Sequence, residues 1–239
     1  MFNQLTPVVK NLLIINVLVF LASEAMPELK LYLSGFYFES NLFRPWQLVT
    51  HMFMHGGFTH IFFNMYALFL FGSILESQWG GRRFLTYYIL CGLGAFGLHE
   101  FVNFLEIRQL MTQLDNGELQ MVVEEGYGIL LEGKNFSNQT MASLNLAINI
   151  PVVGASGAVF GLLLAFGMLF PDVRLQLLFP PVALKAKWFV LIYGAIELML
   201  AIGNMPGDSI AHYAHLGGML FGYLILKFWS YRERHSGTF

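Results

Sequence analysis

The chain has 239 residues, of which 56% are hydrophobic and only 12% are charged. Soluble domains contain about 25% charged residues, so this composition excludes an ordinary soluble protein and favours a membrane protein that crosses the bilayer several times. The formal net charge of −2 identifies no partner by itself, and we expect no nucleic-acid partner. A single cysteine, Cys91, excludes an intrachain disulfide.

Six apolar runs each approach the ~20 residues that a helix needs to cross a bilayer. They cover residues 8–25, 55–76, 84–105, 152–170, 188–202 and 212–229. Because they are continuous rather than alternating, they predict helices, which satisfy their own backbone hydrogen bonds in lipid. The sequence therefore predicts an all-α membrane protein, a six-transmembrane helix bundle that forms one domain over residues 1–239. The first run also has the length of a signal peptide.

Two segments do not fit a membrane span. Residues 26–49 mix proline and charged residues with aromatic ones, which favours a loop or short amphipathic helices at the membrane interface. Residues 103–149 form a polar insert that holds six acids and two bases between Glu106 and Lys134. We expect the insert to be an ordered or semi-ordered loop, which could include a short helix, and not a separate domain.

The basic residues predict the orientation. Of the thirteen lysines and arginines, nine fall on one side of a six-span arrangement and four fall on the other. The richer side is cytoplasmic by the positive-inside rule, so both termini are predicted to be cytoplasmic and the insert extracytoplasmic. We expect an integral multi-pass protein of a bacterial inner membrane.

Polar side chains recur near the start of the second, fourth and sixth runs, which share a depth on the extracytoplasmic side. These residues are His60, Asn64, Ser156 and His215. Polar groups inside a bilayer are costly unless they are partnered, so each is a functional candidate. A neutral His215 could take the proton of Ser156, and His60 with Asn64 could stabilise an oxyanion.

Glycines accompany Ser156 and His215. Gly157 and Gly161 are four apart in the fourth run, and Gly218 and Gly222 are four apart in the sixth. Such small-residue ridges let helix backbones approach closely. We therefore expect these glycines to pack the two helices together, although a serine among glycines is also common in helices that only pack.

The sequence supports fewer conclusions about its acidic residues and its other histidines. Asp208 is in a loop, and its position relative to His215 is not fixed by the sequence, which favours a Ser156–His215 dyad over a triad. The role of Glu197 is left open. His51, His55 and His60 could form a metal-binding face, but no cysteine or carboxylate is near them. We expect no metal and no cofactor. Other expectations concern Glu76 (a cap or an anchor for the second loop), Glu100 (solvated), His55 (structural hydrogen bonds) and His212 (interfacial).

Three motifs together resemble those of the rhomboid intramembrane serine proteases: Gly154-Ala-Ser-Gly157, His60-x-x-x-Asn64 and Ala214-His-x-x-Gly218. The resemblance extends from the first run to Trp229. It implies a catalytic Ser156–His215 dyad, an oxyanion hole from His60 and Asn64, and no cofactor. It further implies transmembrane protein substrates within a lipid bilayer, cut in or beside their membrane helices, and a mobile fifth helix.

The chain departs from the family pattern in three places. Phe160 stands where several relatives have a tyrosine beneath the histidine, so ring packing is expected without a hydroxyl. Arg44-Pro-Trp46 reverses a Trp-Arg pair, and the insert before the fourth run is long. Two other functions remain open: a catalytically silent binder of transmembrane clients, and a small transporter that moves protons through Glu197 and the histidines.

Overall fold

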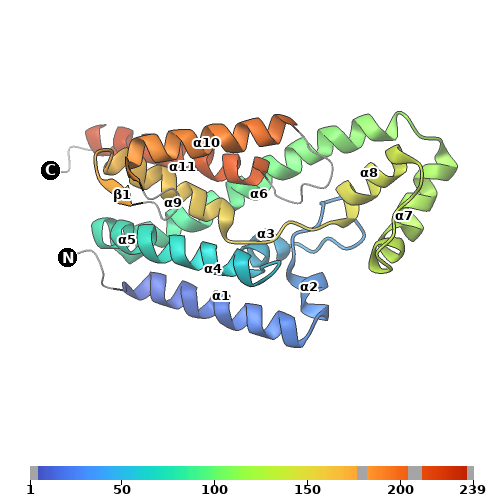
Figure 1. Cartoon of the computed structure of the whole chain (residues 1–239), viewed down its shortest axis with the longest axis horizontal. Helices are drawn as coiled ribbons and strands as arrows, with labels where there is room; N and C mark the ends of the chain where they lie inside the picture. Colours follow the sequence, from blue (N-terminus) through green and yellow to red (C-terminus); the bar gives the residue numbers. More distant parts are fainter. Residues whose placement is uncertain (1–4, 177–181, 204–211, 236–239) are drawn as a thin grey trace.

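A computed structural model describes residues 5–176, 182–203 and 212–235 of the chain. Five helices make up most of the bundle (Figure 1): α1 (Pro7–Ala25), α6 (Gly81–Met111), α9 (Ser156–Leu169), α10 (Ala186–Gly203) and α11 (His212–His235). A sixth rod consists of α4 (Phe58–Ala67), the π-helical turn η2 (Leu68–Gly72) and α5 (Ser73–Trp79). A helix thus lies in each of the six predicted runs, with ends that differ by up to six residues.

The remaining elements are short or lie outside the bundle. They are α2 (Glu28–Leu33), α3 (Gln47–Thr50), the 3₁₀ turn η1 (His51–Phe53), α7 (Asn116–Leu131), α8 (Gln139–Asn149), and the strands β1 (Arg174–Gln176) and β2 (Ala183–Lys185). The two strands pair antiparallel, with Leu175 opposite Leu184. The short helices α2 and α3 agree with the interfacial segment predicted for residues 26–49.

Four segments of the described chain are long and apolar enough to cross a membrane: Pro7–Ala25, Phe58–Trp79, Gly81–Met111 and Ala186–Gly203. The apolar helix α9 has only 14 residues, and α11 opens on histidines and glycines and closes on charged residues. The protein is therefore a multi-pass helical membrane protein, and the count of six spans stays a prediction.

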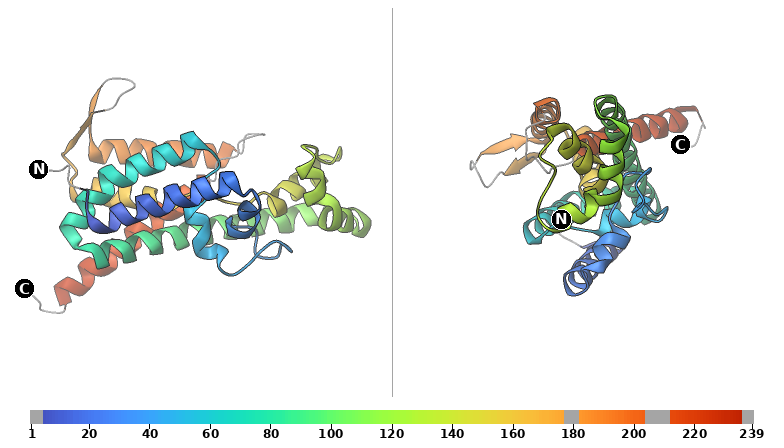
Figure 2. Two further views of the ribbon diagram at one scale, coloured as in Figure 1. Left: turned by 90° about the horizontal axis from the view of Figure 1, so that it is seen from below. Right: turned by 90° about the vertical axis from the view of Figure 1, so that its right-hand side faces the viewer.

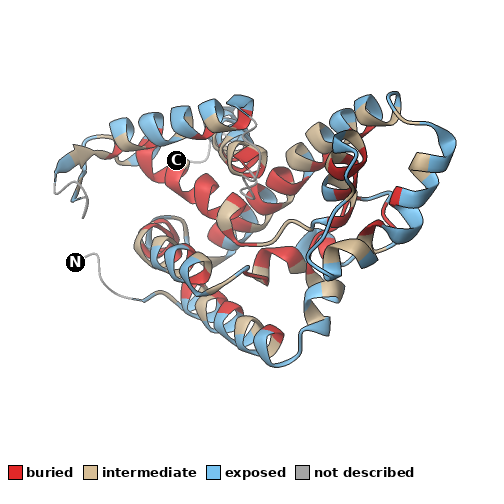
Figure 3. Cartoon of the chain, turned by 45° about the vertical axis from the view of Figure 1, so that its right-hand side comes forward, coloured by how far each residue is buried: buried red, intermediate tan, exposed pale blue. Residues whose placement is uncertain are grey.

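Helix α9 lies at the centre of the bundle. It contacts α6, α10 and α11, and nearly every residue from Gly157 to Gly167 is buried. Figure 3 shows this buried interior running along the middle of the molecule. The first residue of this enclosed helix, Ser156, is half-buried.

Glycines set the distance between α9 and α11. A Cβ atom on Gly218 would overlap the carbonyl of Gly157, and a Cβ on Gly161 would lie 3.1 Å from the carbonyl oxygen of Gly218. A Cβ on Gly222 would lie 3.3 Å from the Cα of Gly161. At these glycines the two helices therefore approach backbone against backbone.

Two buried acids have roles that differ from our expectations. Glu76 accepts hydrogen bonds from Thr6 Oγ1 at 2.5 Å and from the amides of Val8 and Val9 at 2.9 and 2.8 Å. It therefore caps the start of α1 and does not anchor the second loop. Glu100 is buried and accepts a hydrogen bond from the amide of Phe38 at 3.1 Å, so the expectation of a solvated side chain was wrong.

The polar insert is mostly helical, which corrects the expectation of a loop. Helix α6 continues to Met111, and α7 and α8 follow it as a pair that lies beyond the end of the bundle (Figure 1). Asp115 caps α7 by accepting from the amide of Glu118, whose carboxylate accepts from the amide of Asp115 in return. This reciprocal capping box explains why a helix begins there.

The two ends of the bundle differ in what they carry. The start of α1, the end of α11 and the β1–β2 hairpin lie at one end, and α2, α7 and α8 lie at the other (Figure 1; Figure 2, left). At the first end, Lys185 and Lys187 bind Asp172 at 2.9 and 3.1 Å. The described segments near the two termini therefore share one end of the bundle. That both termini are cytoplasmic stays a prediction.

Candidate active site

Ser156 is the first residue of α9, and the chain reaches it through Gly154. The φ of Gly154 is +122°, and its N–H donates to the carbonyl of His51 at 2.9 Å. A Cβ at this position would lie 2.7 Å from His60 Nε2. Both the backbone conformation and the missing space require glycine immediately before the Ala155-Ser156 turn.

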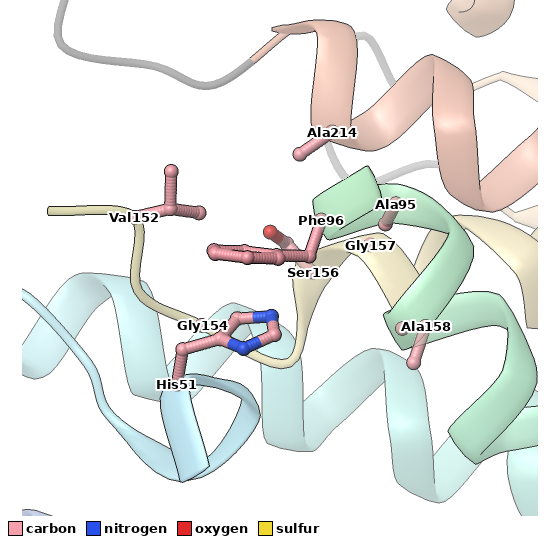
Figure 4. A pocket seen from close by; sticks show the side chains of 10 residues that line it. His51, Ala95, Phe96, Val152, Gly154, Ser156, Gly157, Ala158 and Ala214 are labelled. Carbon is pink, nitrogen blue, oxygen red and sulfur yellow. The ribbon is translucent and has the colours of Figure 1, made fainter. Parts of the chain in front are cut away.

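The side chain of Ser156 lies in a small pocket. Gly154, Ala214 of α11 and His51 of η1 line the same pocket (Figure 4). The His51 ring is held by a 2.8 Å contact from Nδ1 to the carbonyl of Gln47, and burial lowers the pKa of His51 to about 4. The sequence analysis did not assign this neutral histidine to the pocket, because nothing in the spacing shows that η1 turns toward α9.

His60 points one nitrogen toward Ser156. Its Nδ1 lies 3.4 Å from the amide nitrogen of Gly56, which donates to it, so the ring hydrogen is on Nε2. The position of a Cβ on Gly154 would lie 2.7 Å from this Nε2 and 3.5 Å from Ser156 Oγ. A hydrogen-bond donor and the serine hydroxyl therefore approach the same point beside Gly154.

Asn64 is buried one helical turn after His60. Its Nδ2 donates to the carbonyl of His60 at 2.9 Å, a bond within the helix itself. The side-chain amide of Asn64 has two hydrogens, so the second hydrogen can still be donated to another acceptor. The described contacts of Asn64 join it to its own helix and not to a neighbouring one.

His215 is fixed from two directions. Its ring stacks on Phe160 at a centroid distance of 4.1 Å and an interplanar angle of 9°. Phe160 follows Ser156 by four residues, so the two share a face of α9. This stacking confirms the ring packing expected from the departure at Phe160. The described contacts include no hydrogen bond between Ser156 Oγ and His215.

Glu197 of α10 supplies the second contact to His215. Its Oε2 lies 2.9 Å from His215 Nδ1 and 2.6 Å from His212 Nδ1. The sequence singled out Glu197 but did not pair it with His215, because 18 residues separate the two and a helix face cannot be read from an apolar run. His212 is buried, not interfacial as expected. Asp208, the other acid considered, lies outside the described residues.

In the described part of the chain, potential metal-binding atoms gather at this carboxylate and not around His51, His55 and His60. The ligand atoms of Glu197, His212 and His215 lie within 4.8 Å of one another. Near Ser156, the His55 and His60 rings meet edge to face at 5.1 Å. Neither ring nitrogen of His55 has a hydrogen-bond partner in the described part of the chain, so the structural bonds expected for His55 are not found there.

The fold and pocket together define a class: a multi-pass helical membrane protein with a serine, histidines and a buried carboxylate gathered at the end of a central helix. The family model "Rhomboid domain" matches residues 43–232. The chain therefore belongs to the rhomboid family.

Several relatives match about three quarters of the chain. "RHOMBOID-like protein 5" of Arabidopsis thaliana is 27% identical over 180 residues, which cover 75% of this chain and 42% of the relative. "Rhomboid protease AarA" of Providencia stuartii is 25% identical over 181 residues, 75% of this chain and 54% of the relative. "Rhomboid protein 1, mitochondrial" of Saccharomyces cerevisiae is 27% identical over 177 residues, 74% of this chain and 40% of the relative.

The chain thus spans about half the length of the curated relatives it matches, or somewhat less. The relatives come from bacterial and eukaryotic organisms, and some are mitochondrial by name. A multi-pass membrane location agrees with them. The expectation of a bacterial inner membrane, in contrast, finds no support in these comparisons.

Proposed function

We propose that this chain is an intramembrane serine endopeptidase, which cleaves peptide bonds in or beside the membrane-spanning segments of other proteins. One observation carries the proposal: the Ser156 hydroxyl and His60 Nε2 approach one point beside Gly154, in a pocket that α11 closes with Ala214. A nucleophile and a donor around a common point are the arrangement that acyl transfer needs. The relative from Providencia stuartii carries the word protease in its name.

In this proposal Ser156 Oγ attacks the scissile carbonyl carbon and His215 takes the hydroxyl proton. His215 approaches from the Phe160 side of α9, and substrate binding brings its free nitrogen into hydrogen-bond range of Oγ. The negative charge that develops on the carbonyl oxygen is stabilised by His60 Nε2–H, by the remaining amide hydrogen of Asn64 and by the Ser156 N–H. His215 then passes its proton to the leaving amine, and water hydrolyses the acyl enzyme.

A fluorophosphonate probe tests the nucleophile directly. We expect the purified full chain in detergent to be labelled at Ser156 and to cleave a transmembrane substrate. Ser156→Ala and His215→Ala should each abolish cleavage, because removal of one member of a catalytic unit costs nearly as much as removal of all. Ser137→Ala, at an exposed position in the insert, is the matched control and should keep both activities.

The same experiment separates the protease from a catalytically silent binder. A binder would retain a transmembrane client in a stable complex, and its complex would be unchanged by Ser156→Ala. Full turnover in Ser156→Ala would contradict the proposed nucleophile. Proton-coupled flux without cleavage would favour the transporter instead.

We further propose that the pocket opens on the extracytoplasmic side and that both termini are cytoplasmic. The proposal rests on the unequal distribution of basic residues. Asn116→Cys introduces a thiol at an exposed position at the start of α7, and Cys91 is buried. A membrane-impermeant thiol reagent should label the variant in intact cells. Labelling that occurs only after lysis would reverse the orientation.

A further inference from the structure

Glu197 is a buried acid in the middle of an otherwise apolar helix. Only 4% of its surface is exposed, and its neighbours in α10 include Ile196 and Leu198. A carboxylate in such a place is strongly unfavourable unless hydrogen bonds compensate for the lost hydration. Both contacts described for its Oε2 are to imidazole nitrogens, those of His212 and His215.

The contact determines which nitrogen of His215 can act as a base. A carboxylate only accepts hydrogen bonds, so the 2.9 Å contact assigns the ring hydrogen to Nδ1. Nε2 then carries the lone pair. This is the tautomer that can accept a proton from a serine hydroxyl. Stacking on Phe160 fixes the plane of the ring, and the carboxylate fixes its rotation within that plane.

The spacing favours hydrogen bonds over a bound metal ion. Glu197 Oε2 lies 2.6 and 2.9 Å from the two imidazole nitrogens. Ligands about 2.0–2.1 Å from a tetrahedral zinc ion stand roughly 3.3 Å apart, so a metal would need the three groups to separate. The observed distances are those of charge-assisted hydrogen bonds.

We propose that Glu197 is the positioning residue of His215, so that the proposed Ser156–His215 dyad acts as a Ser–His–Glu triad; this inference rests on the proposed function. When Ser156 Oγ bonds to the substrate carbonyl carbon, its proton moves to His215 Nε2. The Glu197 carboxylate stays ionised and stabilises the resulting imidazolium. The proton then passes from Nε2 to the leaving nitrogen as the C–N bond breaks, and Glu197 transfers no proton.

His212 has a supporting part in this arrangement. Its Nδ1 donates to the same oxygen at 2.6 Å, and it lies three residues before His215 on one face of α11. The second donor helps to hold the carboxylate toward α11. His212→Gln should therefore lower kcat less than a change of Glu197 does, because the bond from Glu197 to His215 remains.

The test compares Glu197→Gln with Glu100→Gln in the full chain. Glu100 is a second buried glutamate, in α6, whose described partner is the amide of Phe38. We expect Glu197→Gln to lower kcat by roughly 10³- to 10⁴-fold, the scale seen when a triad acid becomes an amide. KM and the melting temperature should change little. Glu197→Asp should recover part of the lost kcat, and Glu100→Gln should keep it all.

The outcomes are distinguishable from failure of the proposed function. If the unmodified chain cleaves nothing and binds no phosphonate, the protease itself is rejected. If the unmodified chain is active and a folded Glu197→Gln or Glu197→Asp variant keeps full kcat, the triad is rejected and the dyad remains. Loss of activity on treatment with EDTA, restored by zinc, would also overturn the inference, because it would make the cluster a metal site.

Discussion

The glycine-packed pair α9–α11 and the helix pair α7–α8 of the insert are held together in opposite ways. In α9–α11, backbone meets backbone at Gly157, Gly161 and Gly218. In the insert, side chains do the packing, around the cluster Tyr37, Ile107, Val122, Met141 and Leu144.

The difference follows from the two solvents. Lipid gives apolar helices no hydrophobic reason to associate, so close van der Waals contact between small residues has to hold them. The insert lies beyond the bundle (Figure 1) and buries an apolar cluster, as water-soluble helices do. Asn145 adds hydrogen bonds from its Nδ2 to the Gly126 carbonyl and to Asn135 Oδ1, both at 3.0 Å. The α9–α11 pair depends on contacts between backbones, whereas the α7–α8 pair depends on side chains that can be shortened by substitution.

Among the changes that test this comparison, the largest expected effect on stability and rate together comes from adding a side chain to the glycine-packed pair. Gly218→Leu forces an atom into the Gly157 carbonyl, and α11 must move away with His215. We expect a loss of ~1–3 kcal/mol in stability and at least ~10²-fold in cleavage rate, since a shift of ~1 Å is enough for that. Thermal unfolding and substrate turnover measure the two losses.

Gly97→Leu is the matched control for this change. Gly97 also lies in a membrane helix, α6, but a Cβ on it would meet nothing within 4 Å. Leucine there should leave stability and turnover near the unmodified level. Equal behaviour of the two variants would show that backbone contact does not govern the bundle.

A smaller effect is expected from removing the side-chain amide of Asn64, which should change the rate of cleavage but not the stability. If the second amide hydrogen of Asn64 serves the oxyanion, Asn64→Ala should lower kcat by roughly 10²-fold, about 2.7 kcal/mol in the transition state. KM should change little, and the fluorophosphonate should still label Ser156, more slowly. A fall in melting temperature together with kcat would instead assign Asn64 a purely structural role.

The smallest effect on catalysis is expected from a truncation in the insert. Asn145→Ala leaves the buried Asn149 Nδ2 without its described acceptor, at a cost of ~1–3 kcal/mol. A loss of one or two kcal/mol in the stability of α7–α8 raises its unfolded fraction by roughly 5- to 30-fold. Limited proteolysis within α7–α8 should accelerate by the same factor, while substrate turnover stays unchanged. Asn116→Ala, at an exposed position, should alter neither. A parallel fall in turnover would show that the insert supports the site.

Much of this arrangement could be predicted from sequence, because lipid imposes simple rules. A span must be apolar and continuous, which located α1, α6 and α10 to within a few residues, apart from the end of α6 at Met111. Glycines four apart identified the α9–α11 contact. The helical insert could have been found from Asp115-x-x-Glu118, a capping-box pattern that begins α7.

The partners of the buried acids could not be predicted in the same way. Glu76, Glu100 and Glu197 each bind a group far along the chain. Which group a side chain meets depends on how each helix is rotated about its axis, and uniformly apolar helices carry no periodic signal for that rotation. Glu197 was therefore visible in the sequence as an anomaly but without its histidines.

The length of α9 has a consequence for how any substrate is reached. Its 14 residues rise about 21 Å, against ~30 Å for the hydrocarbon core of a bilayer. If the charged residues Asp172, Lys185 and Lys187 lie at one membrane boundary, the Ser156 hydroxyl lies roughly 9 Å beneath the opposite surface. For the proposed protease, the scissile bond and the water that completes hydrolysis would both have to reach that depth. Turnover would then depend on how readily a segment of the substrate helix unfolds in the pocket, and on whether the pocket that contains Ser156 stays hydrated.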